Sequence, residues 1–379
     1  MDTIGPFPLI EVQGDARERG RQHGWKAAER VHLSAEQYLD VLNRRKVGPA
    51  ELKKLVDEFL PVIDRFDPSH VEEMRGIAEG AKIPLEHIVV INARRELLAY
   101  AQRKQDSLGP DGCTAAAVLP EAALEGVLMH GQNWDWREEC ARTSIVLRIQ
   151  RNGNSILALA EAGQLARCGF NESGIAITGN HLDSDRDYRS TGVPLPMIRR
   201  KALENEHYAL AIRTVYGTEK CGSNNMLLSH KDGEAINIEC APDESFLLHP
   251  EDGILVHANH WESIAALSKL SDGGVARNSG LRMMPDSAYR AERVRRRLKA
   301  RRGKVSYEDF RDAFLDNFGS PYSVCRPPRP ALDGSTSATV ATILMRPAEG
   351  VMDIAVLPAI TPRFTRYTLK PQTVRSAAD

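Results

Sequence analysis

The chain has 379 residues, of which 42% are hydrophobic, 27% charged and 6% aromatic, close to the average of globular proteins. This composition excludes collagen-like, intrinsically disordered and disulfide-dense proteins. The 50 basic and 51 acidic residues give a formal net charge of -1, so nothing attracts the whole chain to nucleic acid or an anionic membrane. No apolar run approaches the roughly 18 residues of a membrane span, and no secretory signal is visible. We therefore expect a cytoplasmic protein without a nucleic-acid or membrane partner.

The first hundred residues are predicted to be mainly helical. A short strand at 9–14 precedes a helix-forming stretch over 15–42, and apolar residues at helical spacing follow over 49–66, with a kink allowed at Pro61. Ser69 can cap a helix over 70–82, and Pro84 can open another over 84–101. The polar, glycine- and proline-rich residues 103–112 predict an exposed loop.

From Cys113 onward the pattern changes to short strands joined by turns, and helical patterns return at 193–204, 207–217, 289–302 and 306–318. Hairpin turns are predicted at Asn152-Gly153, Asp232-Gly233 and Asp252-Gly253, the first as type I′. Strands joined by hairpins, with helices before, between and after them, predict an α+β fold rather than a doubly wound parallel sheet. Motifs for phosphate loops, α/β-hydrolase elbows and zinc peptidases are missing from the sequence.

The six cysteines are scattered without a CxxC pair, so we expect reduced thiols, most of them buried. His257 and His260 lie in the sequence HANH, but no carboxylate or cysteine motif accompanies them. We therefore expect neither a metal ion nor another cofactor.

Cys113 opens the first predicted strand of the β-rich part and directly follows Gly112. Glycine permits the unusual dihedral angles that would present its carbonyl to the next side chain. If the thiol attacked that carbonyl, an N→S acyl shift and hydrolysis would release Cys113 as a new amino terminus. An α-amine (pKa about 7.7–8.0) and a thiol (pKa about 8.5) are close enough for the amine to act as general base. The dipeptide by itself favours the other reading, an ordinary buried or loop cysteine after a turn glycine.

Further motifs decide between these readings. The chain resembles the isopenicillin N acyltransferase family, the acyl-CoA:6-aminopenicillanic acid acyltransferase-like cysteine peptidases (family C45) of the N-terminal-nucleophile hydrolases. The resemblance covers most of the chain in the expected order, and its most specific pieces are DGCT (111–114), GQNWDW (131–136), VHANH (256–260) and YSVCR (322–326). Supporting pieces are RERGRQHG (17–24), EMRGIAEGA (73–81) and GFNESGIAITGN (169–180).

The resemblance implies a fold and a processing event. The fold is a four-layer αββα sandwich, in which two antiparallel sheets lie between helical layers. Cleavage between Gly112 and Cys113 would give residues 1–112 as a helical α-chain and 113–379 as a catalytic β-chain, bound together as one αββα domain.

The resemblance also assigns roles to single residues. It implies that Cys113 is the nucleophile, that Asn259 donates to the oxyanion, and that Asp135 and Arg326 form a charged pair beside the nucleophile. A bidentate guanidinium–carboxylate fork would orient the new amino terminus. Candidate substrate-binding residues are Asn133, Trp134, Asn180 and His260.

The sequence differs from other members of the family at two positions. Ala115 and Ala241 stand where family members often carry a hydroxyl residue, which puts the rate of self-cleavage in question.

Residues 290–304 carry nine Arg or Lys residues and one acid. This stretch is either a solvated helix face, a contact for the phosphates of acyl-CoA, or a nucleic-acid contact, and the first reading is favoured because the total charge is near zero.

Two hypotheses for the function follow. In the first, the chain is a self-processing cysteine amidohydrolase or acyltransferase that acts on the amide or thioester of small N-acyl amines or peptide conjugates. Its partner would be a small amide or acyl donor, acyl-CoA among them, and hydrolysis is slightly favoured. In the second, the chain is catalytically silent and acts as a binding or scaffold protein.

Overall fold

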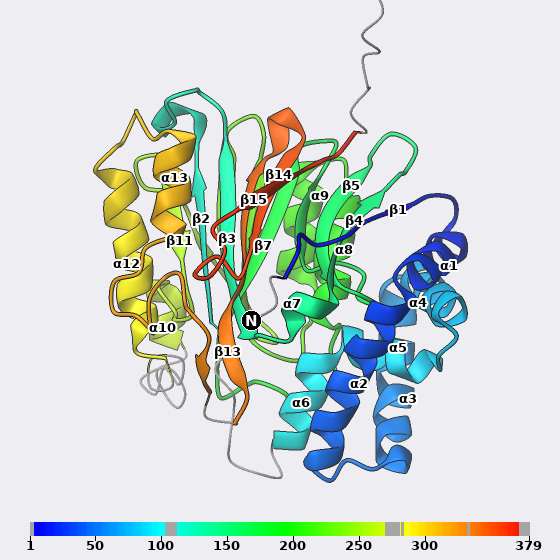
Figure 1. Cartoon of the computed structure of the whole chain (residues 1–379). Helices are drawn as coiled ribbons and strands as arrows, with labels where there is room; N and C mark the ends of the chain where they lie inside the picture. Colours follow the sequence, from blue (N-terminus) through cyan, green and yellow to red (C-terminus); the bar gives the residue numbers. More distant parts are fainter. Residues whose placement is uncertain (1–3, 103–111, 270–280, 282–283, 332–333, 371–379) are drawn as a thin grey trace, which may run out of the picture.

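Two facing β-sheets form the centre of the computed structural model, which describes residues 4–102, 112–269, 281, 284–331 and 334–370 (Figure 1). Nearly every strand residue is buried, because helices cover the outer faces of both sheets. The predicted loop at 103–112 lies outside the described residues except for Gly112.

Sheet A has eight strands, all pairing antiparallel except the parallel pair β1–β4. In spatial order they are β1 (Leu9–Val12), β4 (Ser144–Ile149), β5 (Ile156–Glu161), β6 (Cys168–Asn171), β7 (Ile175–His181), β8 (Asn224–His230), β9 (Glu234–Cys240) and β10 (Ser245–Leu248).

Sheet B has seven strands and is antiparallel throughout. In spatial order they are β11 (Ile254–His257), β2 (Gly112–Val118), β3 (Met129–Arg137), β13 (Thr336–Arg346), β14 (Val351–Val356) and β15 (Phe364–Thr368), and the short β12 (Arg329–Pro330) pairs with β13.

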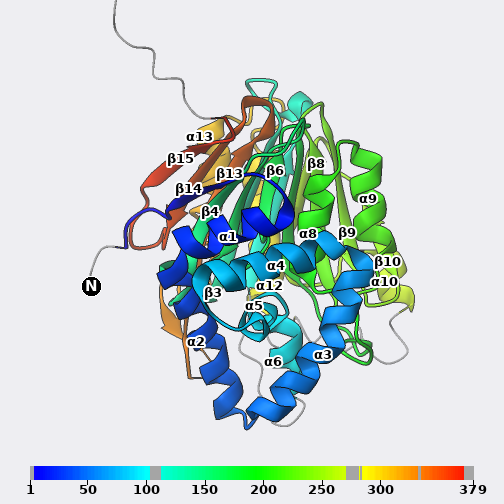
Figure 2. The same ribbon diagram turned by 90° about the vertical axis from the view of Figure 1, so that its right-hand side faces the viewer.

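Helices α12 and α13 pack on the outer face of sheet B, while α8 and α9 pack on that of sheet A (Figure 1). The expected αββα layering of an α+β protein is therefore confirmed. Figure 2 shows α1 to α6 gathered at one end of the sheets. The helices are α1 (Ala16–Lys26), α2 (Ala28–Arg44), α3 (Pro49–Phe66), α4 (Pro68–Ala81), α5 (Leu85–Asn92), α6 (Arg94–Gln102), α7 (Cys140–Thr143), α8 (Leu195–Glu204), α9 (Tyr208–Gly217), α10 (Ile264–Lys269), α12 (Asp286–Lys299) and α13 (Tyr307–Phe314).

Two long predicted helices are each broken into two. The stretch 15–42 bends at Ala27 between α1 and α2. The stretch 84–101 bends at Ala93, because Asn92 binds the turn after β5: its Nδ2 donates to the carbonyl of Gly163, and its Oδ1 accepts from the amide of Leu165. Tertiary hydrogen bonds have thus overridden helical periodicity. At Pro61, α3 continues without ending.

The three predicted turns exist, but two differ from expectation. Between β4 and β5 only Gly153 has a positive φ, so the turn is not type I′. Asp252 and Gly253 both have positive φ, yet β10 before them pairs within sheet A and β11 after them pairs within sheet B. This turn passes the chain from one sheet to the other instead of closing a hairpin. Strands β6, β12 and β15 are additional to the predicted ones.

None of the described helices is both long and apolar enough to cross a membrane.

Glycines bring α1 and α4 into direct backbone contact. Gly20 and Gly24 of α1 face Gly76 and Gly80 of α4, and a Cβ on any of them would overlap a carbonyl oxygen of the other helix. The motifs RERGRQHG and EMRGIAEGA therefore encode this contact.

Replacing Gly76 by alanine should destabilise the protein by about 1–3 kcal/mol, because its Cβ would overlap the carbonyl oxygen of Arg17. Gly217→Ala is the matched control: it also lies in a helix, but an added Cβ meets no atom within 4 Å. Thermal denaturation should show a lower melting temperature for Gly76→Ala only. Equal melting temperatures for the two variants would contradict the close contact.

Candidate active site

Cys113 lies on β2 opposite Trp134 of β3, and its side chain is only 1% exposed. Its backbone nitrogen donates a hydrogen bond of 2.8 Å to Oδ1 of Asn259. Asn259 follows β11 directly, and β11 pairs with β2, so the antiparallel register brings the two residues together. The structure thus places Asn259 beside Cys113, as the resemblance implied.

The side chain of Asn259 is held from three directions. Its Oδ1 also accepts from Nη2 of Arg290 at 2.9 Å, and its Nδ2 donates to the carbonyl oxygen of His181 at 3.1 Å. Its backbone amide donates to Oγ of Ser287. An amide nitrogen carries two hydrogens, and the described residues supply an acceptor for one of them. The second has no acceptor among the described residues.

Position 112 has room only for glycine, because two charged side chains lie where a Cβ would be. A Cβ at this position would overlap Nη1 of Arg326 and lie 2.8 Å from Oδ2 of Asp135. We expected glycine to be needed for unusual dihedral angles, and this was wrong: Gly112 is a strand residue whose φ is not in the positive region.

Asp135 and Arg326 lie beside Gly112 but do not form the expected bidentate fork. Their single close approach is Nε to Oδ2 at 3.3 Å, and Arg326 instead binds Asp286 of α12 directly. Oδ1 of Asp135 accepts from the hydroxyl of Thr339. Oδ2 of Asp135 and Nη1 of Arg326 have no hydrogen-bond partner in the described part of the chain.

Arg290 completes a buried group of two carboxylates and two guanidiniums with Asp135, Asp286 and Arg326. Its Nε donates to Asp286 at 2.7 Å, and its Nη1 donates to the carbonyl oxygen of Cys113 and the hydroxyl of Thr114. Burial tends to raise the pKa of Asp286, but Arg290 and Arg326 outweigh it and leave this pKa below its usual value. Burial raises the pKa of Asp135, and Arg326 offsets only part of the effect.

Arg167 contacts the thiol from the opposite side of sheet B. Its Nη2 lies 3.6 Å from Sγ of Cys113, and its guanidinium stacks on the ring of Trp134 at 4.1 Å. Trp134 therefore lies beside Cys113 and Arg167, and its role in substrate binding stays a prediction. Arg167, Arg290 and Asp286 were missed because no recognised motif contains them: Arg167 precedes β6, and Asp286 and Arg290 lie on α12. One local signal was present: Asp286 and Arg290 are four residues apart, the spacing of an ion pair on a helix.

Three predicted substrate-binding residues lie elsewhere. Asn133 points to the outer face of sheet B, where its Nδ2 donates to the carbonyl oxygens of Phe314 and Val324. Asn180 is buried between the sheets and bonds Gln132 and the carbonyl of His257. His260 bonds Ser287 instead of facing the thiol, and burial lowers its pKa to about 4.

The basic stretch at 290–304 is largely a solvated helix face. Arg293 and Arg297 pair with Asp316, Arg295 pairs with Glu262, and Lys299 pairs with Glu251. Only Arg290 and, in part, its neighbours turn inward, so the face offers no unbalanced cluster for phosphates.

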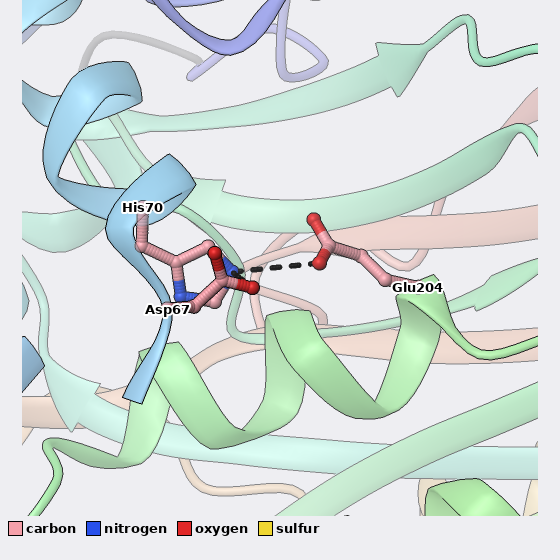
Figure 3. Close-up of side chains that lie close together, drawn as sticks. All are labelled: Asp67, His70 and Glu204. Atoms are coloured by element: carbon pink, nitrogen blue, oxygen red, sulfur yellow. Dashed lines mark ion pairs between the residues drawn. The ribbon is translucent and has the colours of Figure 1, made fainter. Parts of the chain in front are cut away.

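Asp67, His70 and Glu204 could in principle bind a metal ion, since their ligand atoms lie within 4.8 Å of one another (Figure 3). Cations of the protein already occupy the carboxylates, however. Lys201 binds Asp67 at 2.6 Å, while Arg200 and Arg151 bind Glu204 at 2.9 and 3.0 Å. We therefore interpret the cluster as an ion-pair network that joins α4 to α8.

His257 and His260, for which we expected no metal ion, do not form a group of metal ligands with a third residue in the described part of the chain, and His257 binds Glu239 instead. All six cysteines are free and buried, as predicted.

A family model described as acyl-coenzyme A:6-aminopenicillanic acid acyl-transferase matches residues 124–357, more than half of the chain. The chain belongs to this acyltransferase family. The matched range includes Asp135, Asn259 and Arg326 but begins after Cys113. A relative from Emericella nidulans, the acyl-coenzyme A:6-aminopenicillanic-acid-acyltransferase 40 kDa form, is 29% identical over 321 residues, 84% of each protein. The resemblance inferred from the motifs is confirmed.

Solved structures give weaker matches. A variant of conjugated bile acid hydrolase from Clostridium perfringens matches with a TM-score of 0.48 and 14% identity, over 68% of this chain and 92% of that chain. Penicillin V acylase from Agrobacterium tumefaciens matches with a TM-score of 0.43 and 14% identity, over 68% and 86% of the two chains. TM-scores this low do not establish a common mechanism.

His130 connects the two sheets behind the site. It lies on β3, and its ring nitrogens bond the hydroxyls of Ser229 and Thr178 in sheet A at 2.7 and 2.8 Å. Burial lowers the pKa of His130 to about 3. Between this value and the usual 6.5, the unfolded chain binds a proton that the folded chain does not. The folded state is therefore favoured fully above pH 6.5 and loses this contribution as the pH falls.

His130→Gln should flatten the acid side of the stability curve, by up to about 1.4 kcal/mol per pH unit between pH 6 and 4. Urea unfolding at several pH values would measure this, in a Cys113→Ala background that excludes chemistry at the thiol. His207→Gln, at an exposed position, is the control and should leave the slope unchanged. An unchanged slope in His130→Gln would mean that the native protein protonates this ring.

Proposed function

We propose that the chain is a self-processing enzyme with an amino-terminal cysteine nucleophile, which cleaves amide or thioester bonds of small N-acyl compounds through an acyl-enzyme. The observation that carries the proposal is the convergence on Cys113 of Asn259 at its nitrogen, Arg167 at its sulfur and Asp135 beside the preceding glycine. Membership of an acyltransferase family supports it. A cysteine that served only to fill the hydrophobic core would need none of these polar neighbours.

Self-cleavage would begin with attack of the Cys113 sulfur on the carbonyl carbon of Gly112. The carbon–nitrogen bond breaks, the nitrogen takes a proton and becomes an α-amine, and a thioester joins Gly112 to the sulfur. Water hydrolyses this thioester, leaving a carboxylate on Gly112 and a free thiol. Arg167 favours the thiolate electrostatically, and the second amide hydrogen of Asn259 is placed to bind the oxyanion.

The released α-amine would then remain fixed. Asn259 Oδ1 already binds this nitrogen, and Oδ2 of Asp135, which lies close to the preceding Gly112, has no hydrogen-bond partner in the described residues. The amine removes the thiol proton as the sulfur attacks the substrate carbonyl, and passes it to the departing amine. The acyl-enzyme then reacts with water, or with an acceptor amine.

Hydrolysis and acyl transfer share every step up to the thioester. Family membership favours transfer, since the matching relative is an acyltransferase. The described part of helix α12 favours hydrolysis, because its cations are paired with carboxylates and offer no site for the phosphates of acyl-CoA. We retain hydrolysis as the main activity and acyl-CoA-dependent transfer as the second candidate.

Cys113→Ala should yield an intact chain without amidase or acyltransferase activity, with turnover reduced by roughly 10⁴-fold or more. The wild-type chain should separate on a denaturing gel into fragments 1–112 and 113–379, and mass spectrometry should find Cys113 as a new amino terminus. Cys240→Ala, which removes another buried thiol, is the control and should be cleaved and active. An uncleaved, inactive wild-type chain would favour the scaffold hypothesis.

Gly112→Ala should slow self-cleavage by about 100-fold, because the added Cβ must displace Arg326 and Asp135 from the bond to be cut. The half-time of cleavage can be followed on gels after expression and purification. A fold as stable as that of the wild type would show that the loss concerns the reaction. Cleavage of Gly112→Ala at the wild-type rate would contradict the role of these two charges.

A further inference from the structure

A cationic cavity lies directly beside the thiol. Guanidinium groups of Arg94, Arg95, Arg167 and Arg199 line it, and Gly179 and His181 of β7 form another part of the wall. The enclosed part of the cavity measures about 30 Å³, room for one small polar group such as a carboxylate, and the cavity opens to solvent. It borders the candidate active site, since two of its wall residues contact that site: Arg167 contacts Cys113, and the carbonyl of His181 binds Asn259.

The carboxylates around the cavity are already engaged or poorly suited to balance these cations. Glu161 binds Arg94 at 2.7 Å, and Asp183 binds His181 at 2.7 Å. Glu96 lines the cavity and accepts from the backbone amide of Leu195, and burial raises the pKa of this carboxyl. Arg95 binds His181.

Arg167 and Arg199 remain without an anionic partner. Each is 5% exposed, and among the described residues no carboxylate lies within ion-pair distance of either guanidinium. The Nε atoms of both have no hydrogen-bond partner there. A thiolate at Cys113 would act electrostatically on both guanidiniums, but it contacts only Arg167 among the two, whereas Arg199 donates its hydrogen bond to the neutral amide oxygen of Asn224 at 3.1 Å.

The backbone is shaped to hold Arg199 in this position. A Cβ on Gly179 would lie 2.6 Å from Nη2 of Arg199, so only glycine lets the guanidinium lie across β7. Burial, followed by repulsion from Arg167, lowers the pKa of Arg199 to about 10. Keeping an unbalanced guanidinium buried is costly, and a planar carboxylate is the anion that fits it best.

We infer that this cavity binds a carboxylate of the substrate, so that the enzyme selects short N-acyl compounds that carry a negative charge. The inference rests on the proposed function, because it places the reacting carbonyl at Cys113. A monoanion suits the cavity better than a phosphate dianion, since Glu96 contributes to the same wall. The small volume limits the occupant to a short chain.

The test compares pairs of amides that differ only in charge. One pair varies the acyl group, N-glutaryl against N-valeryl amides of 7-amino-4-methylcoumarin. The other pair varies the amine, N-valeryl-β-alanine against N-valeryl-propylamine. In one of the two pairs, the wild-type enzyme should prefer the charged member by at least roughly 30-fold in kcat/KM, the range expected for a charged hydrogen bond.

Arg199→Met should remove most of this preference, because it should lower kcat/KM for the charged member far more than for the neutral member. Arg199→Lys should retain part of it, because the charge is kept. Arg189→Met, which removes an exposed arginine, is the matched control. Turnover of the neutral amides that depends on Cys113, without a charge preference in either pair, would overturn the inference and leave the proposed function intact.

If no amide is turned over, a binding measurement tests the anion-binding cavity separately from the proposed function. Glutarate, but not glutaramide, should raise the melting temperature of the Cys113→Ala protein, and Arg199→Met should abolish the shift. No turnover together with a glutarate shift would remove the proposed function and keep the anion site. Equal shifts with both compounds, or no shift, would overturn the site.

Discussion

The hydrogen bond from the backbone nitrogen of Cys113 to Asn259 is the interaction on which the site depends. It joins the first residues of β2 to the residues after β11, and it exists because these strands are neighbours in one antiparallel sheet. The same Asn259 oxygen binds Arg290, and the Asn259 nitrogen binds the end of β7 in the other sheet. One side chain thereby connects both sheets and the outer helix layer at Cys113.

Sheet B separates two electrostatic environments around Cys113. On its outer side, Asp135, Asp286, Arg290 and Arg326 form a buried group in which two negative and two positive charges balance. On its inner side, Arg167 and Arg199 are cations without a carboxylate partner in the described residues. The balanced group can hold the amino terminus without attracting ligands, whereas the unbalanced side is suited to an anion. Opposite faces of one strand can therefore serve maturation and recognition separately.

The sequence predicted the αββα fold and brought Cys113, Asn259, Asp135 and Arg326 together, because short motifs identified each of them. It did not reveal Arg167 or Arg199, since a buried arginine is recognised only through its neighbours in space. Arg290 was hidden among surface arginines, although its spacing from Asp286 was informative. The error at Asn133 was avoidable: side chains alternate along a strand, so a residue next to Trp134 must face the other way. The helix breaks at Ala27 and Ala93 depend on distant contacts that no local pattern records.

Described residues of the segment 4–102 form part of the cavity wall. Arg94 and Arg95 come from α6, while Arg94 binds Glu161 of β5 and His23 of α1 accepts from the amide of Gly163. In the cleaved form that we propose, these contacts join two separate polypeptides. Renaturation of the mature enzyme would then be a bimolecular reaction, whereas the precursor folds as one chain. The yield of refolding of the mature protein would depend on its concentration. The time for which the mature enzyme stays active would therefore be set by its rate of unfolding.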